Sequence, residues 1–217
     1  MKIRLVATTI LFGITSVAVA DDRTGLSLIP LFGYSQLSDQ TAVLSGLDSG
    51  NGAARVEIDS GFMAGLALRY HFDSPFSSEF GWEYRSNDSV IIDAAGMELP
   101  AGNYASNVFY FNGRYDLAVT SGRFRPWIGG GLSIVQEVDL DSESAAGEVS
   151  FSDSGSIGYQ LMVGVDVEMT GPWYVTTELR YSDQRGLTLE QEETGDGIVA
   201  AIDYQPITVQ LGIGYRF

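Results

Sequence analysis

The feature that most constrains this chain is a recurring alternation of apolar residues with polar or small ones. Between residues 60 and 72, Leu66 and Leu68 fall on one face, whereas Ala67 and Arg69 fall on the other. A period of two predicts β-strands, because successive side chains of a strand point to opposite faces. The alternation recurs in five further segments and, less regularly, in two more: 79–85, 105–117, 157–169, 173–182 and 207–217, then 26–36 and 126–136. The sequence therefore predicts an all-β fold of eight antiparallel strands.

Alternation alone also suits a soluble antiparallel barrel whose apolar face points inward. Strand length favours a membrane barrel, because most segments run for about ten residues or more, as a tilted bilayer-crossing strand must. The second face combines glycine with charge, which suits a narrow lumen. Aromatic residues gather near the predicted strand ends, as in membrane girdles: Phe72, Phe76, Trp173, Tyr215 and Phe217. We expect a closed up-and-down transmembrane β-barrel of eight strands.

The first twenty residues have the order of a secretory signal peptide. Lys2 and Arg4 precede an apolar run, and Ala18-Val19-Ala20 supplies the small residues of a cleavage site. The alternative is an uncleaved anchor, but the run is short for a spanning helix. We expect residues 1–20 to be a cleaved signal peptide and residues 21–217 to form one barrel domain.

The connections between the predicted strands alternate in length. Short links fall near 73–77, 117–123 and 170–172, and long links fall near 38–59, 86–103, 137–155 and 183–203. A barrel with both termini in the periplasm requires this order, with short periplasmic turns and long outer loops.

Charge is concentrated in the long links. After residue 20 the chain holds ten arginines, no lysine and 28 acidic residues, a formal net charge of −18. The long links contain 19 of these acids and only Arg55 and Arg185 as bases, so we expect acidic extracellular loops. Such a surface repels nucleic acid, and anionic lipid unless divalent cations intervene, so no nucleic-acid partner is expected. Cysteine is absent, which excludes a disulfide scaffold and a cysteine nucleophile.

The end of the chain carries the most specific local pattern. Leu211, Ile213, Tyr215 and Phe217 alternate with small or polar residues up to a terminal aromatic. With the segment 124–132, Phe-Arg-Pro-Trp-Ile-Gly-Gly-Gly-Leu, this pattern resembles the small eight-stranded outer-membrane barrels of the OmpA-like transmembrane-domain and opacity-protein superfamily. The resemblance implies a place in the bacterial outer membrane and a C-terminal signal that the barrel-assembly machinery reads. It includes no periplasmic peptidoglycan-binding domain, so no wall-anchoring role is carried over.

The predicted inward face holds nearly balanced charges: Arg69, Arg85, Arg114, Arg180 and Arg216 against Glu79, Glu83, Asp116, Asp166, Glu168 and Glu178. An eight-stranded barrel is only just wide enough for its side chains to fill it, and buried charges need partners. We therefore expect a plugging charge network, with Arg69 or Arg114 as the partner of Glu83 and Glu178. Its members are Arg69, Glu83, Arg85, Arg114, Asp166, Glu178 and Arg180. The alternative is an ion path gated by exchange of salt bridges.

No catalytic residue is expected. His71 is the only histidine, and it falls on the predicted lumen face near a short turn. Asp73 and Asp116 could orient it, but no obvious serine completes a triad. The three glycines at 129–131 lack the following lysine and helix of a phosphate loop and predict close strand approach instead.

Two acidic runs are candidate cation sites: Asp139, Asp141 and Glu143, then Glu190, Glu192 and Glu193. Their carboxylates are the hard oxygen ligands that Ca²⁺ and Mg²⁺ prefer. The EF-hand spacing is not met, because Ser144 stands where its glycine belongs. Solvated loop charge is the simpler interpretation. Weak cation binding that bridges to lipopolysaccharide phosphates is the alternative, and no other cofactor is expected.

These features predict an outer-membrane barrel with a structural or surface-interaction role: envelope integrity, adhesion or recognition by the outer loops. The alternatives are a narrow channel or small-solute porin and, more distantly, a lipid-modifying barrel enzyme. We expect a monomer whose partners are outer-membrane lipid, lipopolysaccharide and, during biogenesis, the barrel-assembly machinery.

Overall fold

The fold is that of a computed structural model, which describes residues 24–37, 40–45, 52–92, 96, 98–117, 122–144, 147–153, 156–191 and 198–217. The segment 1–20, expected to be a signal peptide, lies outside these residues. The described part of the chain contains twelve strands: β1 (Gly25–Gln36), β2 (Gln40–Ser45), β3 (Gly52–Ile58), β4 (Gly61–His71), β5 (Phe76–Ile92), β6 (Glu98–Asp116), β7 (Phe124–Ser144), β8 (Gly147–Asp153), β9 (Ile157–Glu168), β10 (Trp173–Gln191), β11 (Ile198–Tyr204) and β12 (Ile207–Arg216). Within it, no helix is long and apolar enough to cross a membrane.

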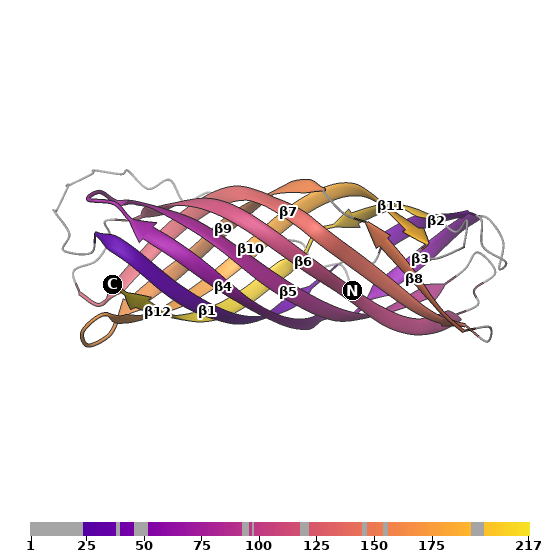
Figure 1. Cartoon of the computed structure of the whole chain (residues 1–217), viewed down its shortest axis with the longest axis horizontal. Helices are drawn as coiled ribbons and strands as arrows, with labels where there is room; N and C mark the ends of the chain where they lie inside the picture. Colours follow the sequence, from indigo (N-terminus) through magenta and orange to yellow (C-terminus); the bar gives the residue numbers. More distant parts are fainter. Residues whose placement is uncertain are drawn as a thin grey trace, which may run out of the picture.

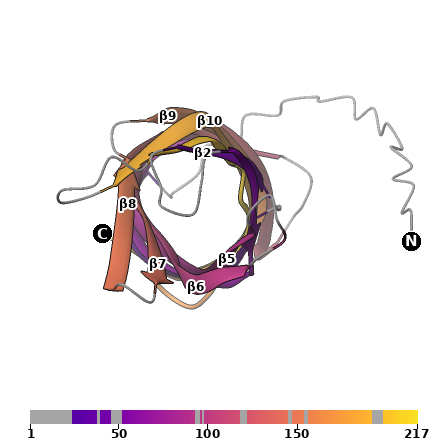
Figure 2. The ribbon, with the colours of Figure 1, turned by 90° about the vertical axis from the view of Figure 1, so that its right-hand side faces the viewer.

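Eight of these strands close into one antiparallel barrel. Each pairs with the next in the order β1, β4, β5, β6, β7, β9, β10 and β12, and β12 pairs back with β1. The strands wind obliquely around the long axis in Figure 1, and the end-on view of Figure 2 shows the closed ring. Closure pairs the strand edges, which a sheet must do to span a bilayer. The predicted fold, a closed barrel of eight antiparallel strands, is confirmed.

The short links and the ends of the barrel lie together. The links 72–75, 117–123 and 169–172 join β4 to β5, β6 to β7 and β9 to β10, close to the predicted positions. At the same end, the backbone N–H of Phe217 donates to the carbonyl of Leu26 at 2.9 Å, which ties the end of β12 to the start of β1. We call this end of the barrel the turn end.

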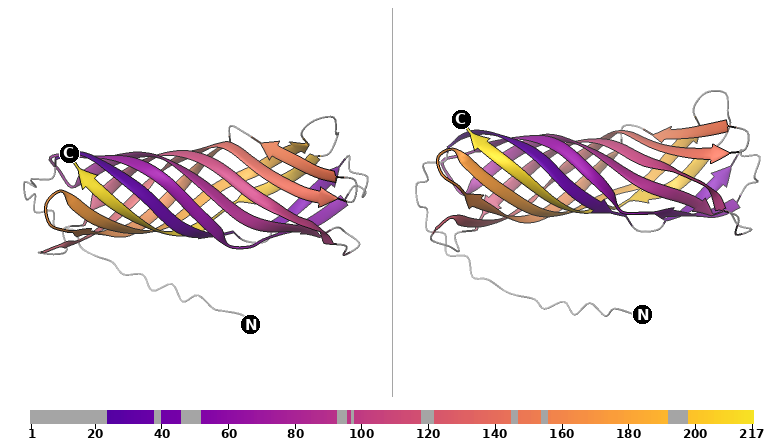
Figure 3. Two further views of the ribbon diagram at one scale, coloured as in Figure 1. Left: turned by 60° about the horizontal axis from the view of Figure 1, so that its bottom comes forward. Right: turned by 90° about the horizontal axis from the view of Figure 1, so that it is seen from below.

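At the opposite end the wall continues as a second ring of paired strands. The strands β2, β3, β8 and β11 pair with one another or with the far halves of β5, β7 and β10, and β6 stays paired between β5 and β7. The register of one ladder carries on unchanged, because the pair Ser35↔Gly61 of β1 and β4 is continued by Gln40↔Val56 of β2 and β3. The β5–β6, β6–β7 and β10–β11 ladders each contain a register shift. We call this ring the extension; it lies at the end away from the C-terminus in both views of Figure 3.

The prediction of four long loops is therefore wrong for most of their residues. β7 runs unbroken to Ser144 and β10 to Gln191, and β2, β3, β8 and β11 occupy much of the remaining stretches. The physical reason is that backbone groups still pair outside the bilayer, whereas alternation is required only where one face meets lipid. Without that requirement, the extension carries little period-two signal.

Inside the barrel the predicted faces are confirmed. Leu66 on the outer face of β4 is 44% exposed, whereas the neighbouring Ala67 and Arg69 are 0% and 1% exposed. Exposed apolar side chains run from Leu26 to Tyr34 along β1 and from Ile207 to Phe217 along β12. This ring of exposed apolar side chains, the apolar band, is the surface that meets the lipid chains.

Aromatic pairs mark the edge of the apolar band at the turn end. The ring centroids of Tyr70 and Phe72 lie 5.1 Å apart, and those of Phe76 and Tyr115 lie 5.0 Å apart. The Trp173 ring packs edge-on against Tyr215 at 4.8 Å. Aromatic rings at this depth seat a barrel at the membrane interface.

Candidate functional site

The lumen near the turn end is filled by a compact group of charges, the turn-side cluster, which consists of Arg69, Glu79, Arg114 and Asp166. The guanidinium of Arg69 donates to Glu79 at 2.6 and 2.8 Å and reaches Asp166 at 3.2 Å. Arg114 donates to the same Asp166 carboxylate at 3.1 Å. Trp127 Nε1 adds a bond to Asp166 at 3.0 Å, so three donors converge on one carboxylate.

A second group, the extension-side cluster, lies farther from the turn end and consists of Glu83, Arg85, Glu178 and Arg180. Arg180 donates through Nη1 to Glu83 at 2.8 Å and through Nε to Glu178 at 2.7 Å. Arg85 Nη2 donates to the other oxygen of Glu83. Each cluster contains two arginines and two carboxylates, and all eight residues are at most 3% exposed. Groups of balanced charge that are joined by ion pairs are the form in which buried charge is tolerated.

The structure brings the seven residues of the expected network into the lumen and adds Glu79, but the predicted partners are wrong. Arg69 and Arg114 do not pair with Glu83 and Glu178; they bind Glu79 and Asp166. The position of each residue along the barrel axis decides which charges pair. Arg69 lies directly across from Glu79 in the β4–β5 register, whereas Glu83 lies opposite Gly65, farther up the barrel.

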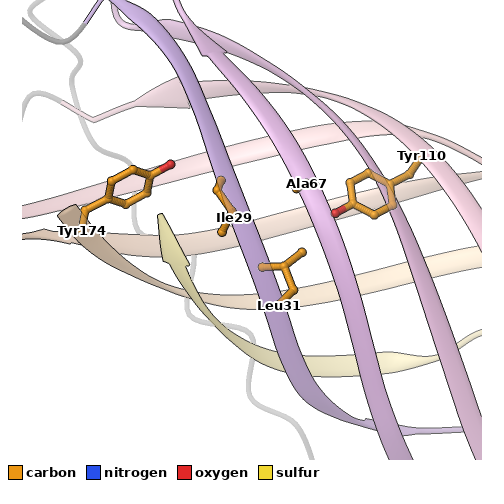
Figure 4. Close-up of a cluster of buried hydrophobic side chains, with 5 residues drawn as sticks. All are labelled: Ile29, Leu31, Ala67, Tyr110 and Tyr174. Atoms are coloured by element: carbon orange, nitrogen blue, oxygen red, sulfur yellow. The ribbon is translucent and has the colours of Figure 1, made fainter. Parts of the chain in front are cut away.

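Five buried apolar residues, which we call the apolar layer, lie against both clusters. They are Ile29, Leu31, Ala67, Tyr110 and Tyr174. Figure 4 shows these side chains between β1, β4 and the strands behind them. Tyr174 reaches the turn-side cluster through a 3.5 Å bond from Arg69, and Tyr110 lies under Arg180 of the other cluster. Sequence reasoning missed this layer, although the continuous apolar run 28–32 is typical of a strand buried on both faces.

Three aromatic rings of the lumen each cover a glycine on the neighbouring strand. Tyr110 lies across from Gly81, Trp127 from Gly164, and Tyr174 from Gly214, and a Cβ atom at any of these glycines would collide with the ring. The other face of the Trp127 ring meets an arginine, with Arg114 Cζ 3.4 Å from the ring centroid. Glycine thus makes room for the ring, and the ring carries a cation, which is a favourable stack when both groups are buried.

At the mouth of the turn end, charges are partly exposed. Arg216 Nη2 lies 3.3 Å from Glu168, and Arg125 Nε lies 3.6 Å from the same carboxylate oxygen. Solvent reaches these side chains, so this group weakens more readily with salt than the two clusters.

His71 is the last residue of β4, at the turn end, and its side chain is buried. Its ring meets Tyr174 edge-on at 6.2 Å, and its partner across the β4–β5 ladder is Ser77, a neighbour that sequence reasoning missed. Both side chains are 5% exposed or less. The pair therefore offers no accessible nucleophile to a substrate.

The candidate cation residues cannot be placed as a site. Asp139, Asp141 and Glu143 belong to β7 and Glu190 to β10, but their side chains, like Glu192 and Glu193 altogether, lie outside the described residues. Among the residues that are described, no group of three or more histidine or acidic side chains could hold a metal ion.

The C-terminal pattern forms the outer face of β12. Leu211 and Ile213 point into the apolar band and are more than half exposed. The ring centroids of Tyr215 and Phe217 lie 5.1 Å apart. The residues of the expected assembly signal are thus a lipid-facing row that ends at the turn end.

Known proteins share this architecture. A family model described as outer membrane protein beta-barrel domain matches residues 5–217. No curated protein sequence matches the chain. Among solved structures, the chain is similar to the outer membrane protein OprG from Pseudomonas aeruginosa, with a TM-score of 0.70 and 16% identity over 90% of this chain and 97% of that one. It is also similar to Neisserial surface protein A, with a TM-score of 0.52 and 13% identity over 89% of this chain and 99% of that one.

Proposed function

Because the chain belongs to the outer membrane protein β-barrel domain family, we propose that it serves in the bacterial outer membrane as a closed scaffold with a structural or surface-interaction role. The role is envelope integrity, adhesion or recognition, and the extension is the part that meets partners. The barrel itself conducts no solute along its axis and catalyses no reaction.

The filled lumen carries this proposal. The turn-side cluster, the apolar layer and the extension-side cluster together occupy the lumen. Removing one partner of a buried ion pair costs about 3–5 kcal/mol, so neither cluster opens readily. The apolar layer adds a constriction of the kind that closes pores by excluding water. Buried ion pairs and buried apolar side chains together favour a wall over a channel.

Single-channel recording in planar bilayers tests the closed lumen. We expect no conductance steps from the wild-type barrel. Tyr110→Ala removes the ring that fills the layer over Gly81 and should raise the frequency of open events. Phe109→Ala, a change at the adjacent lipid-facing residue, is the matched control and should stay silent. Stable, long-lived wild-type openings would overturn the proposal.

The extension is assigned to the cell exterior and the turn end to the periplasm, as in barrels with short periplasmic turns. Protease added to intact cells should then cut within the extension, between residues 137 and 155 or between 183 and 203. Cleavage only after the outer membrane is permeabilised would reverse this orientation. An acidic exterior would meet lipopolysaccharide phosphates through divalent cations, which chelation should release.

A narrow route for small solutes is the second candidate, and an interruption of the wall favours it. Among the residues that the structure describes, the β1–β12 ladder ends at Gln36↔Ile207, and pairing between β2 and β11 begins at Val43↔Ala200. A solute that entered the extension could leave sideways here without crossing the clusters. Swelling of proteoliposomes in arabinose separates the two functions, because a closed scaffold swells no faster than empty liposomes. Faster swelling that persists in Ala67→Leu, which thickens the apolar layer, would support the side route.

A further inference from the structure

The ladder between the first and last barrel strands, which we call the seam, is interrupted in the middle of the apolar band. Its register runs through Leu28↔Tyr215, skips Ile29 and Pro30, and resumes at Leu31↔Gly212. The bond from Phe217 N to Leu26 O sets the phase in which even-numbered residues of β1 bond to β12. Pro30 falls in that phase and has no N–H, so β12 receives no donor from β1 at this level.

The other side of β1 has no such gap. Its ladder with β4 runs without a skip from Gly25↔His71 to Ser35↔Gly61 and includes both Ile29 and Pro30. The seam has eight register pairs, fewer than any of the other seven ladders of the barrel. A missing backbone bond is costly in lipid because no water replaces it. The seam is therefore the weakest joint in the wall.

The lumen charges do not reinforce this joint. All eight residues of the two clusters come from β4, β5, β6, β9 and β10. The pairs that cross the lumen, Arg69 with Asp166 and Arg180 with Glu83, join β4 to β9 and β5 to β10. These strands can remain curled together when β1 and β12 separate.

Next to Pro30, the lumen contacts across the seam are those of Ile29 and Leu31 with Gly212. A Cβ atom at Gly212 of β12 would lie 2.7 Å from both Ile29 and Leu31 of β1, so these side chains rest directly on the glycine backbone. Such contacts are non-directional and are lost gradually as two strands move apart. Opening would turn part of the apolar layer toward the lipid chains, which are as apolar as the layer itself.

We propose that the seam is a built-in joint at which the folded barrel opens locally around Pro30 while both charge clusters remain intact. The proposal goes beyond a closed scaffold, because it names the place and the strands of a lateral opening. The donor missing at Pro30 creates the joint, and the confinement of the clusters to β4–β10 isolates it.

Hydrogen–deuterium exchange of the full barrel in lipid nanodiscs, read residue by residue by NMR, tests this joint. In the wild type, the seam amides of Phe32 and Leu211 should exchange faster than the β5–β6 amides of Gly81 and Tyr110. Pro30→Val restores a donor and should slow exchange of the seam amides about fivefold to tenfold, the equivalent of one backbone hydrogen bond. Pro126→Val is the matched control, since Pro126 lies in β7 near the turn end, and it should leave the seam unchanged.

A covalent lock provides a second measurement that does not depend on Pro30. Ser35→Cys with Thr208→Cys joins register partners across the seam, and His71→Cys with Ser77→Cys joins partners of the β4–β5 ladder. Once oxidised, the seam lock should abolish fast exchange at Phe32 and Leu211, whereas the β4–β5 lock should not. Seam amides that exchange no faster than those of β5–β6, or a seam lock without effect on them, would overturn the proposal.

Discussion

The lipid face and the lumen face of this wall alternate along the same strands, yet they follow opposite rules. On the lipid face, Leu66 and Leu211 need only be apolar, because lipid chains have no fixed shape. On the lumen face, Arg69 is tolerated only because Glu79 and Asp166 lie within reach. An outer face thus depends on composition, whereas a filled lumen depends on pairwise fit. Mutations on the two faces should therefore be costly for different reasons.

The largest loss should come from Asp166→Ala. It leaves Arg69 and Arg114 without a shared carboxylate and Trp127 Nε1 without its acceptor. We expect a loss of about 3–5 kcal/mol in the free energy of unfolding, the cost of an uncompensated buried charge. Urea unfolding in lipid vesicles measures it. Val165→Ala, at the neighbouring lipid-facing residue, should cost much less, and equal losses would erase the difference between the faces.

Leu66→Arg should cause the next largest loss in the free energy of unfolding. Leu66 is the sixth of the eleven residues of β4, so its side chain lies near the middle of the apolar band. Arginine there should cost about 2–4 kcal/mol. Maleimide labelling of single cysteines from 62 to 70 should show the same two faces as an alternation in accessibility. Uniform accessibility, or a period of three to four residues, would refute the assignment.

Gly164→Ala should cause a smaller but still measurable loss in the free energy of unfolding. The added Cβ atom would meet the Trp127 ring, and overpacking of a filled interior costs about 1–3 kcal/mol. Gly113→Ala is the control, because its Cβ atom would have nothing closer than 4.0 Å on the lipid face. Equal midpoints for the two variants in urea would mean that the lumen is loosely packed.

The smallest effect on stability should come from removing Phe217. Its ring packs on Tyr215, and an aromatic pair contributes about 0.5–1.5 kcal/mol. Phe124→Ala removes another exposed aromatic at the turn end and should cost a similar amount. The two should differ in cells, because only deletion of Phe217 alters the expected assembly signal and should lower insertion, measured as heat-modifiable migration on gels. Wild-type insertion of the deletion variant would remove that role from Phe217.

The two faces of a strand could be predicted from the sequence where lipid covers one side of the whole strand. Lipid on one side produces the period of two, so the faces of β4 and β12 were predictable residue by residue. Partners within the lumen depend on height, which alternation does not report, and Arg69 was therefore assigned to the wrong carboxylates. The apolar layer was missed because residues 28–32 of β1 are apolar on both faces and show no period. The extension was missed because strands that do not meet lipid on one face need not alternate.

The length of the strands that continue into the extension has a mechanical consequence. β7 is one uninterrupted strand of 21 residues, and at roughly 3.3 Å per residue it is about 70 Å long. Tilted by about 40° from the barrel axis, it rises roughly 50 Å, twice the height of an apolar band of about 25 Å. In the proposed orientation, the outer half of the wall is a stiff tube of paired strands. It holds its outermost turns beyond the lipid headgroups, in the sugar layer of lipopolysaccharide. Whatever binds those turns would pull on a hydrogen-bonded tube anchored in the bilayer, and the load would pass directly into the membrane.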